Sequence, residues 1–191
     1  MFRETLFPKQ AAEKNTVNRQ RIVLPNALRS MASSSLKRLR RAARELALNV
    51  LYQVDTCGMP FDEALETALE FADLSDLEAR GEAVAQEARD YTRLLAQGVR
   101  SHKAELDEQI SALAVGWPLD RQPAVDRNVL RLALYEIAHV DSVPPIVAVD
   151  EAVELAKKYS TAESGKFING VLAGYLREHK EELEAEINSD S

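Results

Sequence analysis

Cysteine, aromatic residues and long apolar runs are all scarce in this chain of 191 residues. Its single cysteine, Cys57, excludes a disulfide within the chain. The three histidines, His102, His139 and His179, lie too far apart in the sequence to predict a zinc site, so we expect no metal and no cofactor. No apolar run approaches the roughly 18 residues that cross a bilayer, and the N-terminus lacks the apolar segment of a secretory signal. We therefore expect a cytoplasmic protein that does not bind membranes.

The rest of the composition favours helices over sheet. Aromatic residues make up 6% of the chain and charged residues 29%, while 46% is hydrophobic, which is enough for one sizeable core or two small ones. The net charge of −7 hides an asymmetry: residues 1–44 carry 11 Lys and Arg against 2 Glu, and the remainder is acidic. A basic segment on an acidic body indicates a localised site for a polyanion, although a solvated basic tail would also account for residues 1–30.

The most informative segment is KRLRRAARELALNVLY, residues 37–52. Apolar residues at helical spacing give this segment a buried side. Its basic residues therefore lie on a packed helix, where guanidinium groups can hold phosphates in a fixed geometry. We predict RNA contacts from the basic residues of this segment, which are Lys37, Arg38, Arg40, Arg41 and Arg44.

Apolar periodicity, proline and glycine predict an all-α fold of about seven helices, in one compact unit or two packed helical subdomains. No segment shows the two-residue alternation of a strand. Ser75 and Glu78 form a capping-box pattern at the start of the third helix, and Thr161 is a fair N-cap for the last. The expected helices span residues 36–55, 61–71, 75–102, 103–116, 124–140, 146–159 and 162–176.

Three regions are expected along the chain. Residues 1–35 show no sustained periodicity, and Ser33–Ser35 predict a flexible joint, so we expect a disordered N-terminal extension. Met31 also offers an alternative start of translation. Residues 36–178 form the helical domain, and residues 179–191 form a charged C-terminal tail.

No catalytic set stands out. Cys57 has no paired histidine pattern, and a lone cysteine at a helix end is usually a small core residue. Asp150, Glu151 and Glu154 are followed one turn later by lysines, which predicts a solvated charged face rather than acid–base catalysis. We therefore expect a protein that is not an enzyme.

Two places are candidates for binding. On the first helix, Arg41, Glu45, Leu48 and Tyr52 form a stripe off the main apolar face, with Arg44 beside it, and we expect this stripe to be open to a partner. Basic side chains at a helix start oppose the helix dipole, which favours a functional reason for them over a merely exposed one.

The second place is the segment ESGKFING, residues 163–170. Lys166 and Phe167 lie near a helix N-terminus, where an anion is favoured and an aromatic ring can stack on an unpaired base. Taken alone, Phe167 would suit the edge of the core better. Gly170 and Gly174, four residues apart, predict the close approach of a neighbouring helix.

Several ordered motifs resemble the NusB family of transcription antitermination factors. The segment ARELALNVLYQ at 43–53 is similar to the family's opening helix, and VDRNVLRLALYEIA at 125–138 is similar to its fifth. The most specific part is VPPIVAVDEAVELAKKY at 143–159 followed by ESGKFINGVL at 163–172. The resemblance covers residues 37–178 and is interrupted around Trp117–Pro118.

This resemblance implies a seven-helix fold in two small bundles. It further implies binding of boxA, a short single-stranded RNA element of ribosomal RNA leaders, together with the ribosomal protein NusE, and assembly with RNA polymerase. Arg40, Arg41 and Arg44 would grip the RNA backbone, and Lys166 and Phe167 would contact the RNA at the far end. The positions that match the family's partner-facing residues are Tyr52, Asp120, Asp126 and Glu163.

Two other functions remain as alternatives. Similar helical domains occur ahead of RNA methyltransferases, but that function requires an α/β catalytic domain that this sequence does not contain. A protein-interaction module without specific RNA binding, for example a homodimer that hides the basic surface, is the second alternative.

Overall fold

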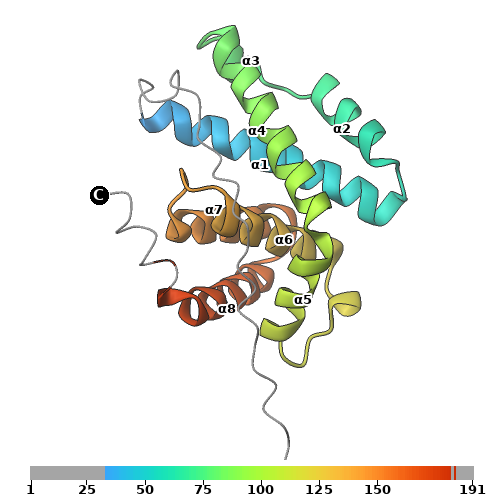
Figure 1. The fold of residues 1–191 in the computed structure, drawn as a ribbon. Helices are drawn as coiled ribbons and strands as arrows, with labels where there is room; N and C mark the ends of the chain where they lie inside the picture. Colours follow the sequence, from blue (N-terminus) through green and yellow to red (C-terminus); the bar gives the residue numbers. More distant parts are fainter. Residues whose placement is uncertain (1–32, 182, 184–191) are drawn as a thin grey trace, which may run out of the picture.

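The computed structural model describes residues 33–181 and 183, which are helical with short connections (Figure 1). No strand occurs in this part of the chain, and the all-α prediction is confirmed. In chain order the elements are α1 (Ser33–Cys57), α2 (Phe61–Glu70), α3 (Ser75–Glu78), α4 (Glu82–Ser101), α5 (Lys103–Leu113), the 3-10 turn η2 (Leu119–Arg121), α6 (Ala124–His139), α7 (Pro145–Tyr159) and α8 (Ala162–Glu178).

The helices form two groups that share one core. Helix α1 packs on α2 and α4 in the upper group of Figure 1, and α5 to α8 form the lower group. Helix α1 also packs on α6, and α7 lies between α6 and α8. The larger of two clusters of buried apolar side chains runs through both groups, so the two predicted subdomains are packed together along α1 and α6, and a smaller cluster joins the start of α1 to α3 and α4.

Helix α1 begins three residues earlier than expected. Its predicted apolar stripe is buried at Leu39, Ala43 and Val50, and this side of the helix packs on α4 and α2. The expected joint at Ser33–Ser35 is wrong, because these serines form the first turn of α1. Residues 1–32 lie outside the described part of the chain, so the rest of the predicted extension stays a prediction.

The predicted third helix is divided into α3 and α4, which accounts for one helix more than the seven expected. The break lies at Gly81, whose φ of +124° is open to glycine and strained for other residues. Ser75 is not an N-cap; its backbone N–H and its hydroxyl both donate to the carboxylate of Asp73. Thr161 does cap α8, because its hydroxyl accepts from the backbone N–H of Ser164 at 3.0 Å.

Helix α6 is the centre of the fold, since every residue from Asn128 to Val140 is buried. Polar side chains on such a helix need partners within the protein. Arg131 has them: its guanidinium donates to Asp107 at 2.6 and 3.1 Å and to Asp55 at 3.3 Å. This cluster ties α6 to α1 and α5.

The carboxylates around Arg131 predict a loss of stability in acid. Burial alone would raise the pKa values of Asp55 and Asp107, but hydrogen bonds from Arg127 and Arg131 outweigh it and hold both pKa values below normal. Such carboxyls contribute stability above their unfolded pKa, about 3.9, and lose it as the pH falls through the folded value. We expect the difference in unfolding free energy between the chain and its Asp55→Asn, Asp107→Asn variant to shrink below about pH 4. Urea unfolding across pH measures it, and a difference unchanged at about pH 2 would contradict the assignment.

The chain end after α8 is described only in part. His179 stacks on Tyr175, with ring centroids 4.1 Å apart, and Leu183 packs against the core. The tail predicted from residue 179 onward is thus partly attached to the domain, and residues 182 and 184–191 lie outside the described residues. Within the part of the chain that the structure describes, no helix is long and apolar enough to cross a membrane.

Candidate nucleic-acid interface

The basic residues of α1 divide into exposed and buried groups. Lys37, Arg38 and Arg41 are exposed, Arg40 is half-buried, and Arg44 is buried. Helix α1 is covered on one side by α2 and α4 and on another by α6, and this decides which of its basic residues reach solvent. Among the basic residues of α1, the side chains of Lys37, Arg38 and Arg41 are therefore the ones that an anion can reach most easily.

Arg41 is exposed but held in place. Its Nε and Nη2 atoms donate to the two carboxylate oxygens of Glu151 on α7, each at 2.9 Å. The side chain is 44% exposed, and the hydrogen bond with Glu151 raises the pKa of Arg41. A two-point contact of this kind fixes the plane of the guanidinium and leaves its remaining N–H groups free to meet a phosphate.

Arg44 corrects the expectation that it would contact RNA. It is 2% exposed and donates to Glu136 of α6 at 2.9 and 3.1 Å. Tyr91 donates its hydroxyl to the same carboxylate, and burial and the charge of Glu136 raise the pKa of Tyr91 well above its usual value of 10.0. Leu48, also expected on an open stripe, is buried as well. Arg44 therefore belongs to the core and has no surface for RNA in this structure.

Glu151 is a second correction, since we expected it on a solvated face. It is buried, it pairs with Arg41, and it lies 3.6 Å from Nη1 of Arg44. Neither Glu136 nor Glu151 was singled out from the sequence as a partner of the arginines. A signal was present for Glu136, because a lone carboxylate within the apolar run LRLALYEIA, residues 130–138, requires a buried cation.

Arg40 turns toward the loop between α6 and α7. Its Nη1 and Nη2 atoms donate to the carbonyl and hydroxyl oxygens of Ser142 at 3.0 and 3.1 Å. Its guanidinium carbon lies 5.9 Å from the centre of the Tyr91 ring. These contacts anchor the loop, so a role for Arg40 in RNA contact stays a prediction.

The exposed cations of α1 continue onto α7 and α8. On α7, Lys157 donates to Glu154 at 2.8 Å, and this hydrogen bond, together with the charges of Lys157, Arg41 and Lys37, lowers the pKa of Glu154. Lys158 donates to Glu45 of α1 at 2.8 Å. We call this surface the basic face and define it by Lys37, Arg38, Arg41, Lys157, Lys158 and Lys166.

Lys166 and Phe167 lie at the α8 end of the basic face. The stem of Lys157 passes over Gly165, where an added Cβ would lie 3.0 Å from the Lys157 Cγ atom, so α7 and α8 meet closely here. Lys166 is exposed and pairs with Glu163, also exposed, at 2.8 Å. Phe167 is half-buried and packs against the core on one side. Both the surface role and the core role foreseen for Phe167 are thus open to this side chain.

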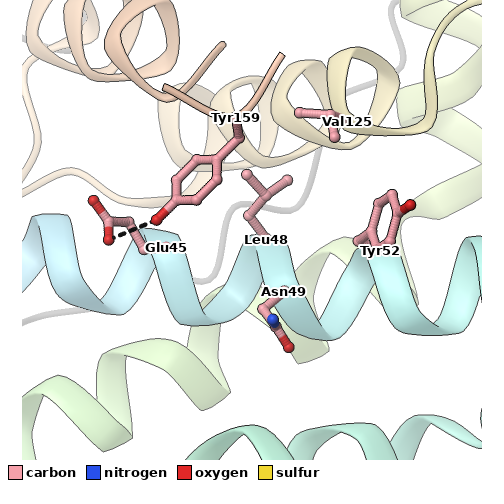
Figure 2. A pocket seen from close by; sticks show the side chains of 6 residues that line it. All are labelled: Glu45, Leu48, Asn49, Tyr52, Val125 and Tyr159. Carbon is pink, nitrogen blue, oxygen red and sulfur yellow. Dashed lines mark hydrogen bonds between the residues drawn. The ribbon is translucent and has the colours of Figure 1, made fainter. Parts of the chain in front are cut away.

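The predicted partner residues do not form one exposed surface. Tyr52 is 39% exposed and lines a pocket of about 310 Å³ between α1, α6 and α7, together with Leu48, Val125 and Tyr159 (Figure 2). The Tyr159 hydroxyl donates to Glu45 at 2.9 Å at one end of this pocket. The aromatic rings and the apolar floor give it the character of a protein-binding site.

Asp120 and Asp126 differ in exposure. Asp120 is exposed on η2, whereas Asp126 is 3% exposed at the start of α6, with its Oδ1 atom buried and without a hydrogen-bond partner. The expectation that Asp126 faces outward is therefore wrong for the chain as it stands. Among the described residues, no group of three or more His, Cys, Asp or Glu side chains is arranged to hold a metal ion.

Comparison with known proteins identifies the family of this chain. A family model described as the NusB family matches residues 41–177. The chain belongs to the NusB family. A transcription antitermination protein NusB from Symbiobacterium thermophilum is 44% identical over 138 residues, which cover 72% of this chain and 89% of that protein. The NusB protein of Acidothermus cellulolyticus is 46% identical over 134 residues, which cover 70% of this chain and 84% of that protein.

Solved NusB structures share the fold. NusB from T. maritima is 34% identical with a TM-score of 0.62, covering 76% of this chain and 96% of that chain. A crystal structure of the antitermination factors NusB and NusE in complex with dsRNA includes a chain that is 32% identical, with a TM-score of 0.60, over 71% of this chain and 94% of that chain.

Proposed function

We propose that this chain is a non-catalytic, cytoplasmic transcription antitermination factor. It binds boxA-type single-stranded RNA of ribosomal RNA leaders together with the ribosomal protein NusE, and the assembly joins RNA polymerase. The observation that supports RNA binding most directly is the basic face, whose cations lie on three helices in contact, α1, α7 and α8, with Phe167 next to Lys166 in the sequence.

The basic face suits a phosphate backbone better than a protein carboxylate surface. Lys37, Arg38 and Arg41 lie within the first three turns of one helix, so their charges are spaced along a rigid rod. Each phosphate that such a group neutralises releases counterions, which gives affinity without reading the bases. Glu151 holds Arg41 in one orientation, and this lowers the entropy lost when a phosphate binds.

Lys166 and Phe167 complete the surface. Lys166 contacts a phosphate, and the exposed part of the Phe167 ring stacks on a base that is not paired. Stacking requires an unstacked base, so this arrangement favours single-stranded over duplex RNA.

For NusE we propose contact with the pocket around Tyr52. Tyrosine offers a large, rigid ring with a hydroxyl at its tip, which suits a protein interface. Asp120 and Glu163 are exposed carboxylates that would attract a basic ribosomal protein. Asp126 is buried, so we assign it no direct contact.

The test of the proposed function is RNA binding by fluorescence anisotropy. A boxA-type oligonucleotide, a scrambled single strand and a boxA duplex are each titrated with the full chain, with and without NusE. We expect preferential binding to single-stranded boxA RNA that NusE strengthens. Equal weak binding to all three, unchanged by NusE, would reject the proposal and favour a protein-interaction module.

Replacing Tyr52 with alanine is expected to weaken NusE binding about 30-fold or more, as for a central aromatic residue of an interface. Isothermal titration calorimetry with NusE measures it. Phe71→Ala is the matched control, because Phe71 is an exposed aromatic residue that does not line the Tyr52 pocket. If both variants bound NusE as tightly as the unchanged chain, the pocket would not be the partner site.

A further inference from the structure

A second groove lies beside Lys166 and Phe167, between the turn after α5 and the first half of α8. Its volume is about 470 Å³, within the range of ligand sites. Trp117, Phe167 and Lys166 line it together with Gly170 and the end of α5. Trp117 lies where the resemblance to the family is interrupted.

We propose that Trp117 and Phe167 hold one unpaired RNA base in this groove, as a continuation of the strand bound by the basic face. The proposal rests on the proposed function and extends it with a base-stacking residue, Trp117, on a different element from Phe167. Stacking on an aromatic ring tolerates every base, because each base has a π face, so the groove contributes affinity for single strands rather than sequence readout.

The indole of Trp117 is exposed yet fixed at its backbone. Its side chain is 47% exposed. The turn at Gly116, with φ of +79°, lets the Trp117 N–H donate to the carbonyl of Ala114 at 3.0 Å. The side-chain amide of Gln122, itself buried, donates to the Trp117 carbonyl at 3.0 Å. A large apolar ring kept at the surface by such a turn costs less entropy on stacking than one on a free loop.

Gly170 keeps the groove open. The predicted close helix contact at Gly170 is wrong, because a Cβ added there would meet no atom within 4 Å. At Gly174 a neighbouring helix does come close, because an added Cβ would lie 3.4 Å from the Leu113 side chain of α5. The space above Gly170 is therefore not needed for helix packing, and a larger side chain there would fill the groove without displacing a neighbour.

The one charged side chain that lines the groove, Lys166, favours a nucleic acid over an apolar peptide. Lys166 is also one of the cations of the basic face, so a strand bound to these cations would have a positive charge at the groove. A strand following the basic face from α1 over α7 to α8 would reach Phe167 and then Trp117. Its phosphates stay near cations while one base enters the groove.

The experiment uses the chain's own fluorescence, because Trp117 is its only tryptophan. The full chain is titrated with single-stranded boxA-type RNA, and Trp117 emission and anisotropy of a labelled strand are recorded together. We expect emission to be quenched with the same midpoint as the anisotropy change. Trp117→Ala should weaken RNA binding about 10- to 100-fold, the range for one stacked base, and Trp117→Phe should retain most of the affinity.

Two leucine substitutions on α8 form a matched pair. Gly170→Leu should fill the groove, abolish the quenching and weaken binding to the extent that Trp117→Ala does. Ala173→Leu, which places the same side chain at an exposed position of α8 that does not line the groove, should bind RNA as the unchanged chain does. Thermal unfolding confirms that both variants remain folded.

The possible failures are distinguishable. If the strand binds by anisotropy while Trp117 emission and the affinity of Trp117→Ala stay unchanged, the groove proposal is overturned and the proposed function stands. If NusE quenches Trp117 and RNA does not, the groove belongs to a protein partner and the proposal is also overturned. If the unchanged chain binds no RNA at all, both fail together.

Discussion

Replacing Glu136 with alanine is expected to lower the free energy of unfolding by about 3–5 kcal/mol, the usual loss when one member of a buried ion pair is removed. The change leaves Arg44 charged, 2% exposed and without its main acceptor. It also removes the acceptor of the Tyr91 hydroxyl. Urea unfolding followed by circular dichroism measures the loss.

The control for this prediction is Glu154→Ala, which removes an exposed carboxylate that pairs with Lys157 at 2.8 Å. An exposed pair of this kind contributes less than about 1 kcal/mol. Replacing both buried partners, Arg44→Met with Glu136→Leu, should recover much of the stability because neither member of the pair is left buried without the other. If Glu136→Ala lowered the free energy of unfolding no more than Glu154→Ala does, the buried pair would not be important for stability.

The second large effect concerns RNA. Replacing Lys37, Arg38 and Arg41 together with alanine should remove about three phosphate contacts and reduce the slope of log affinity against log salt by about 2, at roughly 0.7 per contact for single strands. All three side chains are exposed, and Glu151, which loses Arg41, keeps Nη1 of Arg44 at 3.6 Å, so the fold should survive, which thermal unfolding checks. Anisotropy titrations at several salt concentrations measure the slope.

A matched control removes three cations elsewhere, the half-buried Arg93 and the exposed Arg100 and Lys103, on α4 and α5. It changes the net charge equally but should leave the slope almost unchanged. If the two triple variants lost the same slope, RNA binding would depend on overall charge and not on the basic face. Arg44 is left out of both variants, because its replacement would lower stability and so confuse the binding result.

The helices themselves could be predicted from local patterns. The positions of α2, α6, α7 and α8 follow from apolar spacing interrupted by proline or glycine, and these signals act within a few residues. The division of α3 from α4 was missed, because the pattern from Ser75 onward continues in helical register through Gly81, and only the backbone conformation shows the break.

The site was predicted in part. Lys37, Arg38 and Arg41 lie on the surface as expected, Lys166 is exposed on α8, and Lys157 passes over Gly165, the residue before Lys166. Arg44 was placed wrongly for a definite reason. It lies three, four and seven residues before Ala47, Leu48 and Leu51, all buried, so it shares the second covered side of α1. The apolar stripe of α1 in the sequence indicates one covered side, and α6 supplies the other.

The sequence by itself determined the helical class, the family, and a localised concentration of basic residues beside an acidic body, since periodicity and charge are properties of neighbouring residues. Only the tertiary structure decided which of those charges reach solvent. Arg41 and Arg44 are chemically identical and three residues apart, yet one holds a surface position through Glu151 and the other neutralises Glu136 in the core. The same holds for Trp117 and Phe167, which are 50 positions apart and line one groove only because α5 and α8 pack together. Burial and convergence depend on helix packing over long sequence separations, and no local pattern encodes them.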